Sequence, residues 1–215
     1  MPGSIACAQY AQPSTSYTQY APGFEPAAFH SAMNAVGTHD TVRILTLLGT
    51  GSECRDQSRD WRASFRLSPK QRRRGKDLLR AASLLLFCFP GSPTVYYGDE
   101  AGMEGFEDPF NRRTFPWGRE DRALTGWFRA LGRARHRFAA LRKGDIRYVR
   151  AAGPVLAFTR TWEDETVLCA ANAGPAPAEL ELPGGETRTL GPWEGRLLRL
   201  EAGQAAEDVL SERGF

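Results

Sequence analysis

The chain has 215 residues, of which 28 are basic and 25 acidic, so its net charge is +3. Hydrophobic residues make up 41% and charged residues 25%, as in an average globular chain. This length excludes a (β/α)8 barrel of about 250 residues together with a second domain. The longest apolar run, 81–89, is much shorter than the roughly 20 residues of a membrane span. Because the first residues also lack the pattern of a signal peptide, we expect a cytoplasmic protein with no membrane partner.

Residues 1–24 are rich in Ala, Gln, Ser, Thr, Tyr and Pro and contain no charged side chain. No helical or strand period persists there, which predicts a disordered or atypical leader. An apolar-rich stretch then ends at Gly37, and a second one, 44–48, ends in a glycine-containing loop.

Ser68 and Pro69 predict the start of a helix, with Ser as the cap and Pro in the first turn. The helix runs to Phe89. Residues 55–80 contain ten basic and three acidic side chains, which invites a nucleic-acid interpretation. However, the basic part leads directly into the apolar part of the same helix, and too few aromatic residues accompany it to form a stacking platform. We therefore expect no nucleic-acid partner.

A β-favouring run, 94–97, predicts a short buried strand, and 98–118 predicts a long loop. Loops of this length in compact domains are usually functional or mobile. An amphipathic helix follows over 119–143. Five short alternating segments separated by Gly and Pro turns then predict a small antiparallel sandwich: 146–150, 155–160, 166–171, 178–182 and 196–200. The fold class is therefore α/β followed by all-β.

His39 and Asp40 lie just after the first apolar segment. Polar residues that follow a strand in an α/β fold are well placed for a ligand site. There the carboxylate could stabilise developing positive charge, and the imidazole could donate to a hydroxyl. The alternative interpretation is a helix cap or a turn that uses Asp40.

Asp99 and Glu100 follow the predicted strand at 94–97. Neighbouring strand residues point to opposite faces, so at most one of these two carboxylates can face a shared pocket. In the long loop, Asp108 and Arg112 could form a pair that also binds sugar hydroxyls, because both groups hydrogen-bond bidentately. A plain salt bridge is the alternative. Four loop aromatic side chains could stack on sugar rings: Phe106, Phe110, Phe115 and Trp117.

The four cysteines, Cys7, Cys54, Cys88 and Cys169, are scattered and have no metal-ligand spacing. We expect free thiols. The sequence contains no phosphate-binding loop, nucleophile elbow or metal motif, so we expect neither a metal nor a cofactor.

The order of these features resembles the C-terminal part of an α-amylase family glycoside hydrolase. The subgroup is that of neopullulanase, cyclomaltodextrinase and maltogenic amylase. Residues 34–43, NAVGTHDTVR, are similar to the conserved region after barrel strand seven, and residues 90–103, PGSPTVYYGDEAGM, to strand eight and its loop. The resemblance implies the end of a (β/α)8 barrel over 25–143, a C-terminal β-sandwich over 144–202 and a tail over 203–215.

The resemblance also implies roles for individual residues. Asp40 matches the third catalytic carboxylate, which stabilises the transition state, and His39 matches its partner in hydroxyl binding. Asp108 and Arg112 match a pair that binds the next sugar. Asp99 and Glu100 match strand-eight positions with a structural role.

The same resemblance places the nucleophile and the acid/base, which a retaining glycosidase needs, on barrel strands four and five. The match begins near strand seven, so these 215 residues contain neither. We expect a truncated, inactive part of an enzyme that acts on α-glucosidic bonds of starch-derived oligosaccharides or cyclodextrins. The alternatives are a non-catalytic carbohydrate-binding remnant and one half of a split enzyme completed by a separate N-terminal barrel fragment.

Overall fold

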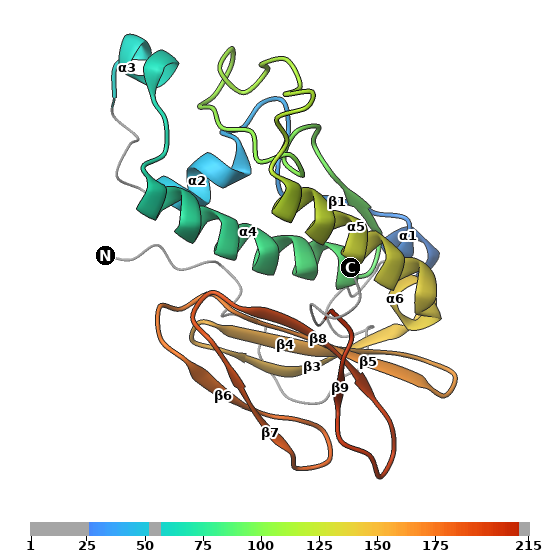
Figure 1. The fold of residues 1–215 in the computed structure, drawn as a ribbon. Coiled ribbons are helices and arrows are strands. Elements are labelled where there is room, and N and C mark those ends of the chain that lie inside the picture. Colours follow the sequence, from blue (N-terminus) through green and yellow to red (C-terminus); the bar gives the residue numbers. More distant parts are fainter. Residues whose placement is uncertain (1–25, 52–56, 211–215) are drawn as a thin grey trace.

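The computed structural model describes residues 26–51 and 57–210; the predicted leader, 1–24, lies outside them, as do Cys7 and Cys54. Figure 1 shows a helical layer stacked on an antiparallel sheet, with a separate hairpin on the far side of that sheet. Within the described residues, no helix is both long enough and apolar enough to cross a membrane. The two described cysteines, Cys88 and Cys169, are free and buried.

The first part of the chain combines helices with one pair of parallel strands. Strands β1 and β2 pair in parallel, with Met33 opposite Ser92. Three helices lie between these strands in the chain, and α4 is the longest of them. The elements are α1 (Pro26–His30), β1 (Met33–Ala35), α2 (Ile44–Thr50), α3 (Arg59–Ser64), α4 (Pro69–Cys88), β2 (Ser92–Thr94), α5 (Arg122–Arg137) and α6 (Ala139–Lys143).

Helix α4 begins where the sequence predicts. The Ser68 hydroxyl accepts a hydrogen bond from the Gln71 N–H at 3.3 Å, and the Gln71 side chain accepts one from the Ser68 N–H at 3.0 Å. This capping box satisfies backbone donors that a helix start leaves free. Further along, Gly75 allows α2 to approach closely, since a Cβ there would lie 2.9 Å from the carbonyl oxygen of Leu45.

The strand predicted at 94–97 is wrong in its position, because β2 covers Ser92–Thr94. Pro93 is tolerated in this strand, since the strand has a partner on one side only among the described residues and the missing N–H breaks no ladder there. Tyr96 and Tyr97 instead contact a buried arginine, described below, and lie outside any strand. The loop predicted over 98–118 is part of a longer stretch, 95–121, that contains no helix or strand.

The single helix predicted over 119–143 is in fact two helices. Asp121 caps α5 by accepting from the Leu124 N–H at 3.2 Å, so the helix begins later than predicted. Phe138 leaves the helical conformation and buries its ring in the core. Glu165, from the sheet, accepts the Ala140 N–H at 2.6 Å and so satisfies the new helix start of α6.

The second part of the chain is a sheet of five antiparallel strands in the order β3-β4-β5-β8-β9, together with the β6-β7 hairpin. Strands β7 and β9 were not among the segments predicted from the sequence. Because β9 pairs with β8, the sheet extends into the segment 203–215 that was expected to be a tail. The strands are β3 (Asp145–Ala152), β4 (Val155–Trp162), β5 (Glu165–Asn172), β6 (Ala178–Glu181), β7 (Thr187–Leu190), β8 (Gly195–Leu200) and β9 (Glu207–Asp208).

Side chains on the central strand β5 alternate between two hydrophobic cores. Val167 and Cys169 pack toward the helices, in a core with Leu84 of α4. Leu168 and Ala170 pack toward the β6-β7 hairpin. The strand is therefore apolar at every position from Val167 to Ala171, because both faces of the sheet are covered there.

Arg160 of β4 connects the sheet to the ends of two helices. It is fully buried, and its guanidinium donates to the Cys88 carbonyl oxygen at 2.6 Å and to the Gly144 carbonyl oxygen at 2.7 Å. These carbonyls end α4 and α6, where a cation also interacts favourably with the helix dipole. Burial, assisted by the nearby charge of Arg135, lowers the pKa of Arg160 to about 10, so the group is still charged at neutral pH.

We predict that Arg160→Met lowers the free energy of unfolding by about 2–4 kcal/mol, because two buried helix-end carbonyls lose their donors. Urea denaturation would measure the change. Arg147→Met is the matched control, since Arg147 is exposed on the neighbouring strand and should change stability by less than about 0.5 kcal/mol. Equal effects of the two substitutions would contradict this role of Arg160.

Candidate functional site

The loops that follow β1 and β2 meet, because parallel strands end at the same edge of their sheet. The four predicted site residues His39, Asp40, Asp108 and Arg112 come together there; we call them the Asp40 cluster. The imidazole Nε2 of His39 lies 3.2 Å from Asp40 Oδ2, and Arg112 Nη2 lies 3.7 Å from Asp40 Oδ1. Arg112 Nε also lies 3.1 Å from Asp108 Oδ1, so the predicted Asp–Arg pair is confirmed.

The Asp40 carboxylate is open to solvent, with 70% of its side chain exposed. The turn around it is held by hydroxyl groups: the Asp40 N–H donates to Thr38 Oγ1 at 3.3 Å, and the Thr38 N–H donates to Thr41 Oγ1 at 3.1 Å. Helix α2 begins after Arg43 without a side-chain cap. Asp40 therefore lies in a turn, as the alternative interpretation allowed, but it does not cap α2, and its carboxylate oxygens are available to a ligand.

Asn111 fixes this turn through its side-chain amide, and the sequence predicted no role for it. Its side chain is fully buried, and its Nδ2 donates to the carbonyl oxygens of His39 at 2.7 Å and Thr41 at 2.8 Å. The only sequence signal is a small amide residue in a long loop, which is too common to identify a support of this kind. Asn111 therefore ties the two loops of the cluster together.

Arg43 lies between the two loops and contacts both. No role for it was predicted from the sequence either. It is 1% exposed. Its Nε donates to the Asn111 carbonyl oxygen at 2.8 Å, and its Nη1 donates to Asp99 Oδ1 at 3.1 Å and to the Tyr97 carbonyl oxygen. The guanidinium carbon lies 4.2 Å from the ring centre of Tyr96 and 4.6 Å from that of Tyr97, as in cation–π pairs. One side chain thus positions the chain on both sides of the cluster.

Asp99 and Glu100, for which a structural role was expected, lie in the turn after β2 and not on a strand. Glu100 accepts the Gly98 N–H at 2.8 Å. Asp99 is 2% exposed and packs against Gly37, where a Cβ would lie only 2.4 Å from Asp99 Oδ2. Burial raises the pKa of Asp99 to about 6, although the hydrogen bond and charge of Arg43 act in the opposite direction.

A second set of ion pairs holds parts of the long loop outside the Asp40 cluster against α4. Arg72 pairs with Glu104 and, at 3.3 Å, with Asp121, while Lys76 lies 2.8 Å from Asp121. Burial opposes ionisation of Asp121, but its bonds to Lys76 and the Leu124 N–H hold its pKa below the usual value. Part of the basic stretch at 55–80 therefore pairs with loop carboxylates.

We predict that Asp99 makes the chain more stable as the pH falls through 6. Its pKa in the folded chain lies about two units above the value near 3.9 of an unfolded aspartate. The folded state therefore binds the proton more tightly, and stability falls by about 3 kcal/mol as the pH rises from about 4 to above 6.

Urea denaturation of the chain and of Asp99→Asn at about pH 4 and pH 7.5 measures this contribution. Relative to the variant, the unaltered chain should gain stability on acidification. The exposed Asp60→Asn serves as the control and should show no such difference. A stability difference that stays constant or grows with pH would disprove the assignment.

A comparison with protein families matches residues 147–210 to the maltogenic amylase C-terminal domain. The matched segment runs from within β3 to the residues just after β9. It therefore covers nearly all of the antiparallel sheet and its hairpin.

Curated relatives match a larger part of the chain. An amylopullulanase from Thermoanaerobacter thermohydrosulfuricus is 43% identical over 132 residues, which are 61% of this chain and 8% of that protein. Neopullulanase 2 from Thermoactinomyces vulgaris is 36% identical over 62% of this chain and 20% of its own length. The chain thus spans well under two thirds of these relatives.

Solved structures share the fold. The cyclic α-maltosyl-(1→6)-maltose hydrolase from Arthrobacter globiformis has a TM-score of 0.64 and 27% identity, with 82% of this chain and 36% of that one covered. Residues 147–210 thus match the maltogenic amylase C-terminal domain, and the chain is a homologue of the amylopullulanase, cyclomaltodextrinase, neopullulanase and maltogenic amylase members of the α-amylase family of glycoside hydrolases.

Proposed function

We propose that the Asp40 cluster binds α-glucan oligosaccharide and supplies the transition-state-stabilising side of a retaining α-glycosidase active site. The observation that carries this proposal is an exposed carboxylate, Asp40, held between His39 and Arg112 at the ends of two parallel strands. The names of the relatives support the substrate class, since they are glycoside hydrolases that act on starch-derived sugars.

The chemistry follows from the groups present. Two carboxylate oxygens of Asp40 can accept hydrogen bonds from neighbouring sugar hydroxyls, and their negative charge opposes the positive charge that develops on the sugar ring. His39 can donate to a hydroxyl of the same sugar. Asp108 and Arg112 form an ion pair, and both groups can hydrogen-bond to the hydroxyls of the adjoining sugar.

In this proposal β1, β2 and the helices within 25–143 are the last elements of a (β/α)8 barrel, and the antiparallel part that follows is the C-terminal sandwich. The parallel pairing of β1 and β2 and the ligand-facing loops at their carboxyl ends support the assignment. An isolated sheet of only two strands is marginally stable in water. Apolar side chains also lie exposed around them, with Met33 76%, Leu47 42% and Trp117 81% exposed. These features support completion by further barrel elements that carry the nucleophile and the acid/base.

We predict that the 215-residue chain binds maltotriose without hydrolysing it. Asp40→Asn and Arg112→Ala should each weaken binding about tenfold or more, because each removes a charged hydrogen-bonding group. Isothermal titration calorimetry measures this. Arg119→Ala is the control, since Arg119 is exposed in the same long loop outside the cluster. Absence of binding heat at millimolar maltotriose would refute sugar binding. Hydrolysis of maltotriose by the chain alone would refute the inference that it lacks the nucleophile and the acid/base.

We further predict that activity appears when the chain is co-expressed with the upstream barrel portion of neopullulanase 2. Maltotriose hydrolysis by the mixture should fall roughly a hundredfold or more with Asp40→Asn, because a charge that acts in the transition state is lost. Arg119→Ala should leave the rate unchanged. A stable complex that binds sugar and remains inactive would favour the non-catalytic carbohydrate-binding role.

A further inference from the structure

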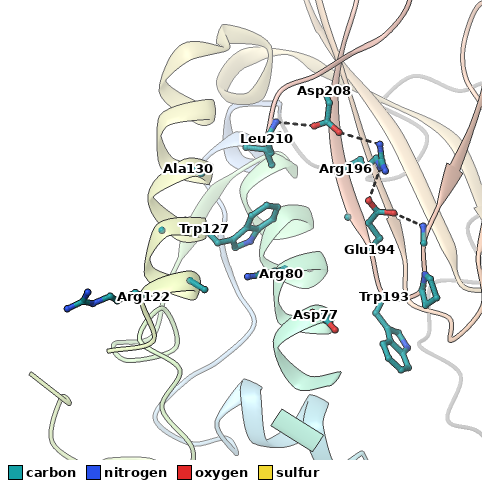
Figure 2. A pocket seen from close by; sticks show the side chains of 15 residues that line it. Asp77, Arg80, Arg122, Trp127, Ala130, Trp193, Glu194, Arg196, Asp208 and Leu210 are labelled. Atoms are coloured by element: carbon teal, nitrogen blue, oxygen red, sulfur yellow. Dashed lines mark hydrogen bonds and ion pairs between the residues drawn. The ribbon is translucent and has the colours of Figure 1, made fainter. Parts of the chain in front are cut away.

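A groove of about 780 Å³ lies between the helical layer and the sheet domain and shares no residue with the Asp40 cluster. Figure 2 shows Asp77, Arg80 and Trp127 on its helix side and Trp193 and Glu194 on its sheet side. Its volume is in the range of about 300–1,000 Å³ that small-ligand sites occupy. The groove has α4 on one side and β8 on the other, and Gly195 allows these two elements to approach closely. A Cβ at this position would lie 2.8 Å from Leu84 Cδ2.

Trp193 is held in this groove by an unusual backbone conformation. Its φ is +54°, which bulky side chains rarely adopt, and such strain concentrates at ligand sites. The turn is fixed by the Trp193 N–H donating to the Gly174 carbonyl oxygen at 3.1 Å and by Glu194 accepting the Gly191 N–H at 2.5 Å. The partly exposed indole is therefore a positioned aromatic face.

The helix side provides charged groups without partners. Within 26–51 and 57–210, the side chains of Asp77 and Arg80 form no hydrogen bond or ion pair, and the Nε of Arg80 is buried. On the sheet side, by contrast, Arg196 pairs with Glu194 at 2.9 Å and with Asp208 at 3.5 Å. The Arg80 side chain lines the groove, so guanidinium N–H groups other than the buried Nε can donate to a polar ligand there.

The charges of the groove select the class of ligand. Three acidic and three basic side chains line it, so its net charge is zero: Asp77, Glu194, Asp208, Arg80, Arg122 and Arg196. A polyanion such as nucleic acid would need a basic excess. A neutral ligand with many hydroxyls and one apolar face fits both the aromatic ring and the planar charged groups.

We propose that this groove is a second carbohydrate-binding site, which takes a maltooligosaccharide with one sugar stacked on Trp193 and its hydroxyls on Asp77 and Arg80. The choice of an α-glucan rests on the proposed function. The groove itself does not depend on the Asp40 cluster, so the two assignments can fail separately.

The test is calorimetric titration of maltoheptaose into the Asp40→Asn/Arg112→Ala double variant, whose remaining binding reports the groove. Trp193→Asn should weaken this binding about tenfold, since Asn tolerates the positive φ and only the aromatic face is lost. Binding that survives this substitution unchanged would overturn the proposal. Unaltered binding in the double variant alone would count against the proposed function and leave the groove assignment standing.

A steric block provides an independent test. Gly126 of α5 lines the groove, and a Cβ there meets no atom within 4 Å, so Gly126→Gln fills the groove and improves helix propensity. Gly132→Gln is the matched control, on the same helix with equally free space and outside the groove. In the double variant, only Gly126→Gln should abolish maltoheptaose binding. Equal effects of the two, or equal heat with cellohexaose, would contradict an α-glucan groove.

Discussion

The buried guanidinium of Arg43 is the interaction on which the Asp40 cluster depends. It ties the turn after β1 to the loop after β2 through Asn111, Asp99 and the two adjacent tyrosine rings. Neither loop has regular secondary structure of its own at these positions. Without a common buried partner, the Asp40 and Arg112 side chains would sit on independently mobile segments, whereas a site needs its supporting shell to be rigid.

The sequence motifs predicted which side chains meet, because strand ends and loop order determine the edge at which they gather. They did not predict the support, since the burial of Arg43 and Asn111 results from three-dimensional packing and has no local signature. The same limit explains the errors in β2 and α5. Among the residues that the structure describes, Pro93 pairs with one strand only, and Phe138 leaves its helix to fill the core. Both are tertiary effects.

The helical layer and the sheet domain form one structure through shared contacts. The core on the helix-facing side of β5 includes residues of α4, α5 and α6, and Arg160 binds the last carbonyls of α4 and α6. The sheet therefore supports α4, which precedes the long loop, and α5 and α6, which follow it. This coupling also creates the groove lined by Trp193, because it lies where α4 and α5 meet β8.

Two aspartates of the same region show how environment divides their roles. Asp99 is buried against Arg43, where desolvation raises its pKa to about 6, and it has no access to a ligand. Asp40 is 70% exposed. An exposed carboxylate interacts weakly with a developing charge, because water screens it. Strong stabilisation of a transition state at Asp40 therefore requires that water be displaced, by the bound sugar and by further barrel elements over the cluster.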